Sequence, residues 1–317
     1  MHINWYPGHM KKTRELIQEN LKMIDVVVEV LDARIPISSK NPSLDDLINT
    51  KPKIVALNKY DLADEVILGK WISYYRAQGI SAIPINSMTG DGINRLLHEI
   101  KVLTKEKRDK YITQGRNLAA VRVMIVGIPN VGKSSLINKL VGKKSAKTGN
   151  RPGVTKGKQW IRIRKDLELF DTPGILWPKI DDDAVGLNLA FTGAIKDEIL
   201  QIDDIGLLLI EKLMIIYPDR LEERYSVEIK ENNELDRLQL MEEIGRRRGC
   251  LLAKNQIDYS KVARIVIDEF RKGTLGRMSL ESPSDFDILD DDKDISEIES
   301  LLESLGLDLD DEDEDEE

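Results

Sequence analysis

The sequence predicts an α/β protein in which a mostly parallel sheet has helices on both faces and a small all-α domain follows. In the 317-residue chain, short apolar, β-branched runs first alternate with helix-like stretches. After Pro178 the helical periodicity continues without clear strand alternation, and the chain ends in a long acidic stretch. Alternating strands and helices are typical of parallel sheets, because parallel strands need crossover connections.

Residues 10–23 are predicted to form a helix, because Leu16, Ile17 and Leu21 lie near one face of it. Four apolar runs have the length of buried strands: Val26–Leu31, Lys53–Leu57, Ala82–Ile85 and Val121–Val126. Helix-like stretches follow three of these runs: Glu65–Gln78, Gly92–Thr104 and Lys133–Leu140. An added hairpin is predicted from two further runs, Gln159–Ile163 and Glu168–Phe170.

The chain divides into three predicted parts. Residues 1–178 form the α/β domain, and residues 179–282 form a helical domain with turns at 217–219 and 271–273. Residues 283–317 are predicted to be a disordered acidic tail, because they have little apolar surface to bury. We find no internal repeat.

Composition excludes a membrane protein, since the chain has no run of roughly 18 or more apolar residues. The first residues lack the basic-then-apolar layout of a secretory signal. Cys250 is the only cysteine, so an intrachain disulfide is impossible, which fits a reducing cytosol. We therefore expect a soluble, cytoplasmic protein, and a monomer.

The net charge of −9 conceals a basic body. Between Asp285 and Glu317 the chain has eighteen acidic residues and one basic residue, whereas residues 1–284 have 46 basic and 38 acidic residues and a net charge of +8. A basic body favours a polyanionic partner, most plausibly RNA. The alternative is that surplus lysines only keep the domain soluble.

The loop Gly127–Ser134 has the G-x-x-x-x-G-K-[ST] pattern that binds nucleotide phosphates, and it lies between a predicted strand and a predicted helix. Backbone N–H groups and the helix N-terminus make an anion site there. Lys133 should reach the β- and γ-phosphates, and the Ser134 hydroxyl should bind Mg²⁺. The alternative is a chance match in a turn. The expected nucleotide-binding residues of this loop are Asn130, Val131, Gly132, Lys133, Ser134 and Ser135.

Asn58, Lys59 and Asp61 resemble the guanine-reading N-K-x-D motif of GTPases. A carboxylate at Asp61 can accept from the two adjacent N–H donors of guanine, a pair that adenine lacks. The Lys59 stem suits covering the base. Asn86 and Ser87 resemble the weaker motif that supports the base. Taken alone, each motif is poor evidence, because N-K-x-D in isolation is more often a helix cap or a turn.

Asp171 and Gly174 belong to a D-x-x-G motif, in which the carboxylate holds Mg²⁺ and the glycine N–H meets the γ-phosphate. Thr155 lies between the phosphate loop and this motif, which is the expected place of a switch threonine that completes the metal shell. The alternative for Thr155 is an ordinary surface turn.

The order of these motifs is unusual, because Asn58–Asp61 precedes the phosphate loop and the D-x-x-G motif, whereas in ordinary GTPases it follows both. The chain thus resembles a circularly permuted GTPase. Three further segments, 5–10 (WYPGHM), 32–36 (DARIP) and 270–281, make residues 3 to about 282 similar to the bacterial ribosome biogenesis GTPase A family. The acidic tail lies outside this resemblance.

The resemblance implies binding of GTP or GDP with Mg²⁺, action late in the assembly of the large ribosomal subunit in the cytoplasm, and contact of the helical domain with ribosomal RNA. Partners would be the subunit precursor, its RNA and its proteins. A solvated helix face is the alternative for the basic residues, since acidic residues are interspersed. The candidate RNA-binding residues are Arg246, Arg247, Arg248, Lys254, Lys261, Arg264, Arg271, Lys272 and Arg277.

Catalysis needs a group that orients water, and Ile175 occupies the position where many GTPases have glutamine. The resemblance implies that an N-terminal histidine takes this role, and His9 matches the motif. His9 is alternatively a structural partner of the preceding turn. Asn130 resembles the asparagine of potassium-stimulated relatives, which suggests K⁺, or it is a neutral loop residue.

We therefore predict an enzyme that hydrolyses GTP to GDP and phosphate, is stimulated by the ribosome, and times a late assembly step. The chain passes from the D-x-x-G motif directly into the helical domain, which links the two covalently. The alternative is a nucleotide-stabilised scaffold for RNA or protein with negligible hydrolysis.

Overall fold

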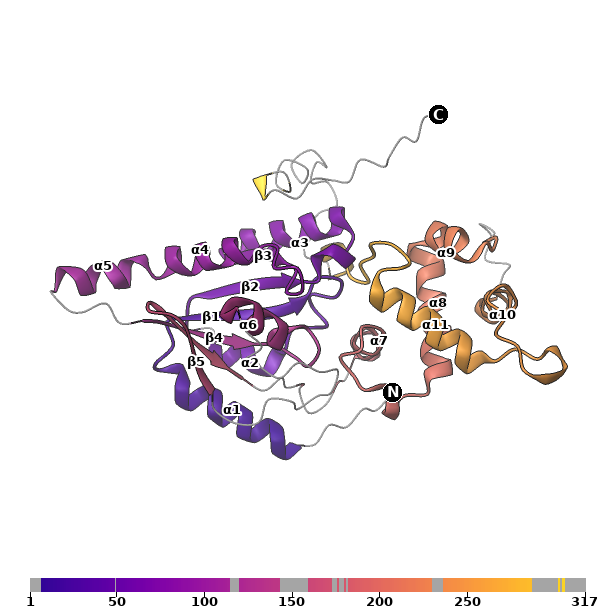
Figure 1. Cartoon of the computed structure of the whole chain (residues 1–317), viewed down its shortest axis with the longest axis horizontal. Coiled ribbons are helices and arrows are strands. Elements are labelled where there is room, and N and C mark those ends of the chain that lie inside the picture. The colour runs from indigo at the N-terminus through magenta and orange to yellow at the C-terminus, as the bar shows by residue number, and fades with distance from the viewer. Residues whose placement is uncertain are drawn as a thin grey trace. The chain divides into compact units, whose positions relative to one another are not determined.

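The computed structural model forms two compact units (Figure 1). The first, the α/β unit, comprises Ile3–Lys179 and Ser279–Glu317, and the second, the helical unit, comprises Ile180–Met278. The structure describes residues 7–48, 50–114, 120–142, 159–172, 176, 180, 182–229, 236–286, 302, 304 and 305.

The α/β unit is built on a six-stranded sheet with strand order β3-β2-β1-β4-β6-β5. Only β5 is antiparallel to its neighbour, and the other pairings are parallel, as predicted. The strands are β1 (Val26–Asp32), β2 (Lys53–Asn58), β3 (Ser81–Ile85), β4 (Val121–Val126), β5 (Gln159–Arg164) and β6 (Leu167–Asp171).

Helices cover both faces of the sheet, which confirms the predicted layers. On one face, side chains such as Val27, Leu31 and Met124 pack in two clusters with helices α1 (Pro7–Leu21), α2 (Pro42–Ile48) and α3 (Glu65–Ala77). On the other face, Val121 and Leu167 line a small cavity with Leu97 and Ile100 of helix α4 (Ile93–Leu103). The described helices of this unit also include α5 (Lys105–Thr113) and α6 (Lys133–Val141).

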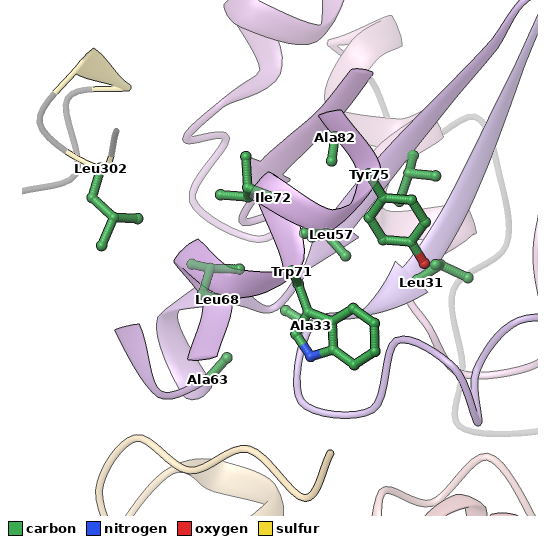
Figure 2. Close-up of a cluster of buried hydrophobic side chains, with 11 residues drawn as sticks. Leu31, Ala33, Leu57, Ala63, Leu68, Trp71, Ile72, Tyr75, Ala82 and Leu302 are labelled. Atoms are coloured by element: carbon green, nitrogen blue, oxygen red, sulfur yellow. The ribbon is translucent and has the colours of Figure 1, made fainter. Parts of the chain in front are cut away.

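Among the described residues, Trp71 of α3 is the largest fully buried side chain, and it lies among Leu31, Leu57 and Tyr75 in the cluster drawn in Figure 2. Burial of large apolar side chains is the main favourable term in folding, so this cluster fixes α3 on the strands β1 and β2. Leu302, from the predicted tail, is also buried in this cluster. Most of that tail lies outside the described residues.

The helical unit contains α7 (Asp183–Phe191), α8 (Ile202–Ile216), α9 (Pro218–Tyr225), α10 (Arg237–Arg247) and α11 (Tyr259–Lys272). At the contact of α8 and α11, a Cβ built on Gly206 would lie 2.4 Å from the Ala263 Cβ, so glycine permits the close approach. Side chains of Asp182, Asp236 and Asp258 cap the N-termini of α7, α10 and α11.

Most predicted elements recur with ends that differ by a few residues, while α2 and α5 have no counterpart among the predictions. Residues 279–282, which we assigned to the helical domain, belong to the α/β unit. Within the described part of the chain, no helix has the length and apolarity needed to cross a bilayer.

Candidate nucleotide-binding site

The parallel strands end at one edge of the sheet, and the described residues of the predicted motifs gather there. In the pairing register, Asp32 at the end of β1 lies beside Asn58 at the end of β2, and Asn58 lies beside Ile85 of β3. On the other side of β1, Val126 of β4 leads into the phosphate loop, and Asp171 ends β6. Open α/β sheets bind ligands at this edge.

The phosphate loop needs glycine at both of its ends. Gly127 and Gly132 have φ angles of 149° and 101°, a region that glycine adopts without strain. A Cβ on Gly127 would lie 2.5 Å from the Val30 carbonyl oxygen, and one on Gly132 would lie 2.1 Å from Asn58 Nδ2. Helix α6 begins directly after the loop, so its first N–H groups point to the same place.

Lys133, the first residue of α6, is buried, and its ammonium donates to the Ile128 carbonyl oxygen. Burial lowers the pKa of Lys133 to about 8, and the nearby Asp171 carboxylate opposes part of that effect. A phosphate anion beside the ammonium stabilises the charged form in the same way, so the site is suited to an anion.

Asn58 ties the base-reading motif to the phosphate loop. Its side-chain Nδ2 donates to the Val131 carbonyl oxygen at 2.6 Å, and its Oδ1 accepts from the Ser87 backbone N–H at 3.0 Å. Asn58 is buried, so both bonds are shielded from water. One side chain therefore joins three segments that are far apart in the sequence.

The base-supporting loop after β3 is stabilised by hydrogen bonds within the loop and by a hydrogen bond from α6. Asn86 Oδ1 accepts from the backbone N–H groups of Met88 at 2.8 Å and Thr89 at 3.0 Å. Lys139 of α6 donates its Nζ to the Met88 carbonyl oxygen at 3.1 Å. Asp61 lies in a 3-10 turn, Tyr60–Leu62, directly after Lys59.

Sequence reasoning missed Asp32 as a functional residue. Its Oδ2 accepts from Lys59 Nζ at 2.8 Å, so it holds the lysine of the base-reading motif. The 32–36 motif is the available signal, although its place in the family resemblance assigns no role to Asp32.

Asp171 and Ser134 are the described candidates for the metal. Asp171 is buried at the end of β6, close enough to Lys133 to act on its pKa. The next residue, Thr172, donates its hydroxyl to the Ile125 carbonyl oxygen at 2.7 Å, which fixes the strand end beside β4. Ser134 and Ser135 lie in the first turn of α6. A carboxylate and a hydroxyl are oxygen ligands of the kind Mg²⁺ prefers.

Several predicted residues lie outside the described ones. Thr155 and Gly174 are among them, and His9 is placed only through the backbone of α1, on which it lies. Asn130 has a φ of 61° in the phosphate loop, next to the buried Val131.

The basic residues of the helical unit fall into two groups. Arg271 is held within the unit, because it donates to both Asp197 carboxylate oxygens and to the Ala190 and Phe191 carbonyl oxygens. Arg248 lies over the Tyr225 ring and near Glu269. Arg277 is half-buried. The other predicted side chains are exposed: Arg246, Arg247, Lys254, Lys261, Arg264 and Lys272.

Two further arginines of the helical unit were missed by sequence reasoning. Arg220 and Arg224 of α9 line an open hollow of about 400 Å³ with the turn Gly273–Gly276 that follows α11. Arg224 makes a two-pronged contact with Glu269 at 3.0 and 2.8 Å. No sequence pattern indicates that α9 and this turn adjoin.

A mostly parallel sheet with a phosphate loop after β4 and the base-reading segment after β2 defines a P-loop GTPase whose motif order is circularly permuted. A family model described as "50S ribosome-binding GTPase" matches residues 122–244.

Sequence similarity to known proteins supports this class of protein. The chain is 50% identical to ribosome biogenesis GTPase A of Bacillus cereus, over 90% of this chain and 96% of the relative. It is 48% identical to the Priestia megaterium protein of the same name, over 90% of this chain and 98% of the relative. The chain therefore belongs to the ribosome biogenesis GTPase A family, as the resemblance predicted.

Two solved structures are similar over most of the chain. A GDP-bound YlqF has a TM-score of 0.60 at 29% identity, covering 85% of this chain and 99% of that one. The GNP-bound YlqF of T. maritima has a TM-score of 0.57 at 28% identity, covering 86% of this chain and 98% of that one. These likenesses support the predicted fold of an α/β GTPase domain followed by a helical region.

Proposed function

We propose that this chain binds GTP and GDP at the edge of the sheet and hydrolyses GTP during assembly of the large ribosomal subunit. The observation that carries the proposal is the pair of Asn58 hydrogen bonds, to the phosphate loop at Val131 and to the base-supporting loop at Ser87. The bonds join the segment that would read guanine to the segment that would bind phosphate. The bound nucleotides named in the two YlqF structures support the same choice of ligand.

In the proposed mechanism, the backbone of the phosphate loop and Lys133 hold the β- and γ-phosphates. Ser134, Asp171 and Thr155 would hold Mg²⁺, which neutralises charge on the phosphates when it is bound. Gly174 would donate its N–H to the γ-phosphate. Binding of an anion beside Lys133 offsets the burial that lowers the lysine pKa.

We propose that His9 accepts a hydrogen bond from the attacking water, since Ile175 has no polar group for this task. Asn130 would help to hold K⁺, which supplies positive charge where other GTPases use an arginine. A neutral imidazole is required for the proposed role of His9, so activity should fall as the histidine becomes protonated.

We propose that the helical unit contacts ribosomal RNA of the large-subunit precursor through its exposed basic side chains. On α11, Lys261, Arg264 and Lys272 are all exposed, with Asp268 between them. Phosphate contacts release counterions, so such binding weakens steeply with salt. Arg271 is omitted from this proposal, because its guanidinium is held by Asp197 and two carbonyl oxygens.

Hydrolysis would then act as a timer. The chain runs from the D-x-x-G motif into the helical unit, so movement of that motif on hydrolysis is covalently coupled to the proposed RNA-binding surface. A flexible Gly-Ser spacer in place of Trp177-Pro178 should leave nucleotide affinity intact and uncouple ribosome binding from nucleotide state. Retained coupling in that variant would refute the timer.

The decisive experiment compares GTP turnover by the wild type and by His9→Ala, with and without large ribosomal subunits, in potassium buffer. We expect subunits to stimulate the wild type strongly, and His9→Ala to lose the stimulation while it keeps GTP affinity.

The second candidate function is a nucleotide-stabilised scaffold, which the replacement of glutamine by Ile175 favours. GTP binding without turnover, unchanged by subunits in both proteins, would support the scaffold.

A further inference from the structure

The loop of residues 33–39 is held in place by one carboxylate. Glu281 accepts from the backbone N–H of Ile37 at 2.8 Å and of Ser38 at 3.0 Å, and also from the Ser38 hydroxyl. Its own backbone carbonyl accepts from Trp71 Nε1 at 3.1 Å. Glu281 is buried, so these charge-assisted bonds are strong and shielded from water.

The same loop carries a buried ion pair. Arg34 donates through Nε to Asp32 Oδ1 at 3.0 Å and through Nη2 to Asp32 Oδ2 at 2.9 Å. The carbonyl of Arg34 accepts from the Leu280 N–H at 2.9 Å. Residues 280 and 281 therefore hold both the backbone of this loop and, through Arg34, the Asp32 carboxylate.

Asp32 in turn holds Lys59. Burial raises the pKa of Asp32, but the charges of Arg34 and Lys59 outweigh burial and keep it below its usual value. The carboxylate is therefore ionised at working pH. Arg34 already pairs with this carboxylate, and the additional bond from Lys59 Nζ at 2.8 Å fixes the direction of the lysine's flexible four-carbon stem.

Residues 279–281, which begin this series of contacts, come directly after the helical unit in the sequence. Ser279 directly follows Met278, the last residue of the helical unit. Its hydroxyl accepts from the backbone N–H of Asp64 at 3.2 Å, and Asp64 caps α3, three residues after Asp61. The chain thus returns from the helical unit to the side of the sheet edge where the base would bind.

We propose that Glu281 and Asp32 are positioning residues that set the release rate of guanine nucleotide by fixing Lys59 over the base. Residues 279–281 directly follow the helical unit in the chain, so they join its last residue covalently to these contacts. This inference rests on the proposed guanine-nucleotide function.

The test measures release of a fluorescent GDP from the full chain by stopped flow, in the wild type, Glu281→Gln and Asp32→Asn. Each change removes one charge and keeps the shape of the side chain. We expect release to accelerate about fivefold or more in both variants, while turnover at saturating GTP by Glu281→Gln stays within about twofold. Asp45→Asn is the matched control, because it removes a charge that Lys40 and Lys53 contact within the same unit and should leave release unchanged.

A second measurement separates positioning of Lys59 from general loosening of the site. Lys59 would cover the base, whereas Asp61 would read its edge, so inosine diphosphate, which lacks the 2-amino group, should be released faster by the same factor as GDP. Acceleration of GDP alone would show that Asp61 has moved and would overturn the route through Lys59.

The experiment distinguishes a folding defect of Glu281→Gln, a failure of this inference and a failure of the proposed function. If Glu281→Gln does not fold, Ser38→Ala removes a single hydroxyl bond and should still accelerate release by about twofold. Unchanged release in folded Glu281→Gln would overturn the inference. Failure of the wild type to bind GDP would instead refute the proposed function.

Discussion

Replacing Asn58 with alanine should weaken the protein at the junction of its base-reading and phosphate-binding segments. The side chain makes two buried hydrogen bonds, to the Val131 carbonyl oxygen at 2.6 Å and from the Ser87 N–H at 3.0 Å. Alanine leaves both backbone groups unsatisfied, at about 1–3 kcal/mol each. Water can enter part of the vacated space, so we expect the free energy of unfolding to fall by about 2–4 kcal/mol.

Urea unfolding of the nucleotide-free chain measures this loss, and titration with fluorescent GDP measures the affinity. We expect the affinity to fall by at least about tenfold, because the phosphate loop and the base-supporting loop are no longer held together. Asn41→Ala is the matched control. Asn41 is also buried and accepts from the Ser43 N–H at 3.0 Å, but it lies before α2, so its loss should reduce stability without changing affinity.

The reasoning about Asn58 fails if the two variants behave alike. A loss of less than about 0.5 kcal/mol in Asn58→Ala would mean that water satisfies the exposed backbone groups. An unchanged GDP affinity would mean that the loops keep their arrangement without this side chain.

Gly132→Ala should lower GDP affinity by at least about tenfold, because its Cβ would lie 2.1 Å from Asn58 Nδ2; normal affinity in a titration would contradict this. The folded-state pKa of Lys133, about 8, is below that of the unfolded chain, so the unfolded state holds more protons above pH 8. Between pH 8 and 9, the free energy of unfolding of the nucleotide-free wild type should therefore rise by up to about 1.4 kcal/mol more than that of Lys133→Met. Urea unfolding measures both changes, and equal changes in the two proteins would exclude this effect. Arg271→Ala should destabilise the helical unit by about 2–4 kcal/mol in thermal unfolding, through loss of its bonds to a carboxylate and two carbonyls. Arg264→Ala should keep the melting temperature and reduce RNA affinity and its salt dependence; equal RNA binding at all salt concentrations would remove Arg264 from the proposed surface.

Local pattern was sufficient for the sheet strands and for the phosphate loop. Val121–Val126 is apolar and β-branched, and it is followed by a loop whose glycines and lysine have fixed spacing, so chemistry and position are both local properties. The predicted helical domain was recognisable for the same reason. Helix α5 was not predicted, because it has no buried residue and therefore no apolar period to detect.

Long-range contacts were not predictable from the pattern. Glu281 bonds to Ser38 across 243 positions, and nothing in the sequence around either residue indicates the other. Similarly, Arg271 has the composition of an RNA-binding residue, but it donates to Asp197 and to carbonyl oxygens near the end of α7. A sequence shows which residues are charged, but it does not show which group each charged side chain pairs with in the fold.

The sequence by itself determined the class of fold, the order of the motifs and the residue types that suit phosphate, guanine and Mg²⁺. These properties depend on short spacings and on side-chain chemistry, both of which are local. Only the tertiary structure decided which side chains join the motifs, namely Asn58 between two loops and Asp32 beside Lys59. The reason is physical, since parallel pairing of β1, β2 and β3 brings the strand ends to one edge, and burial there favours specific partners for the side chains of Asn58 and Asp32.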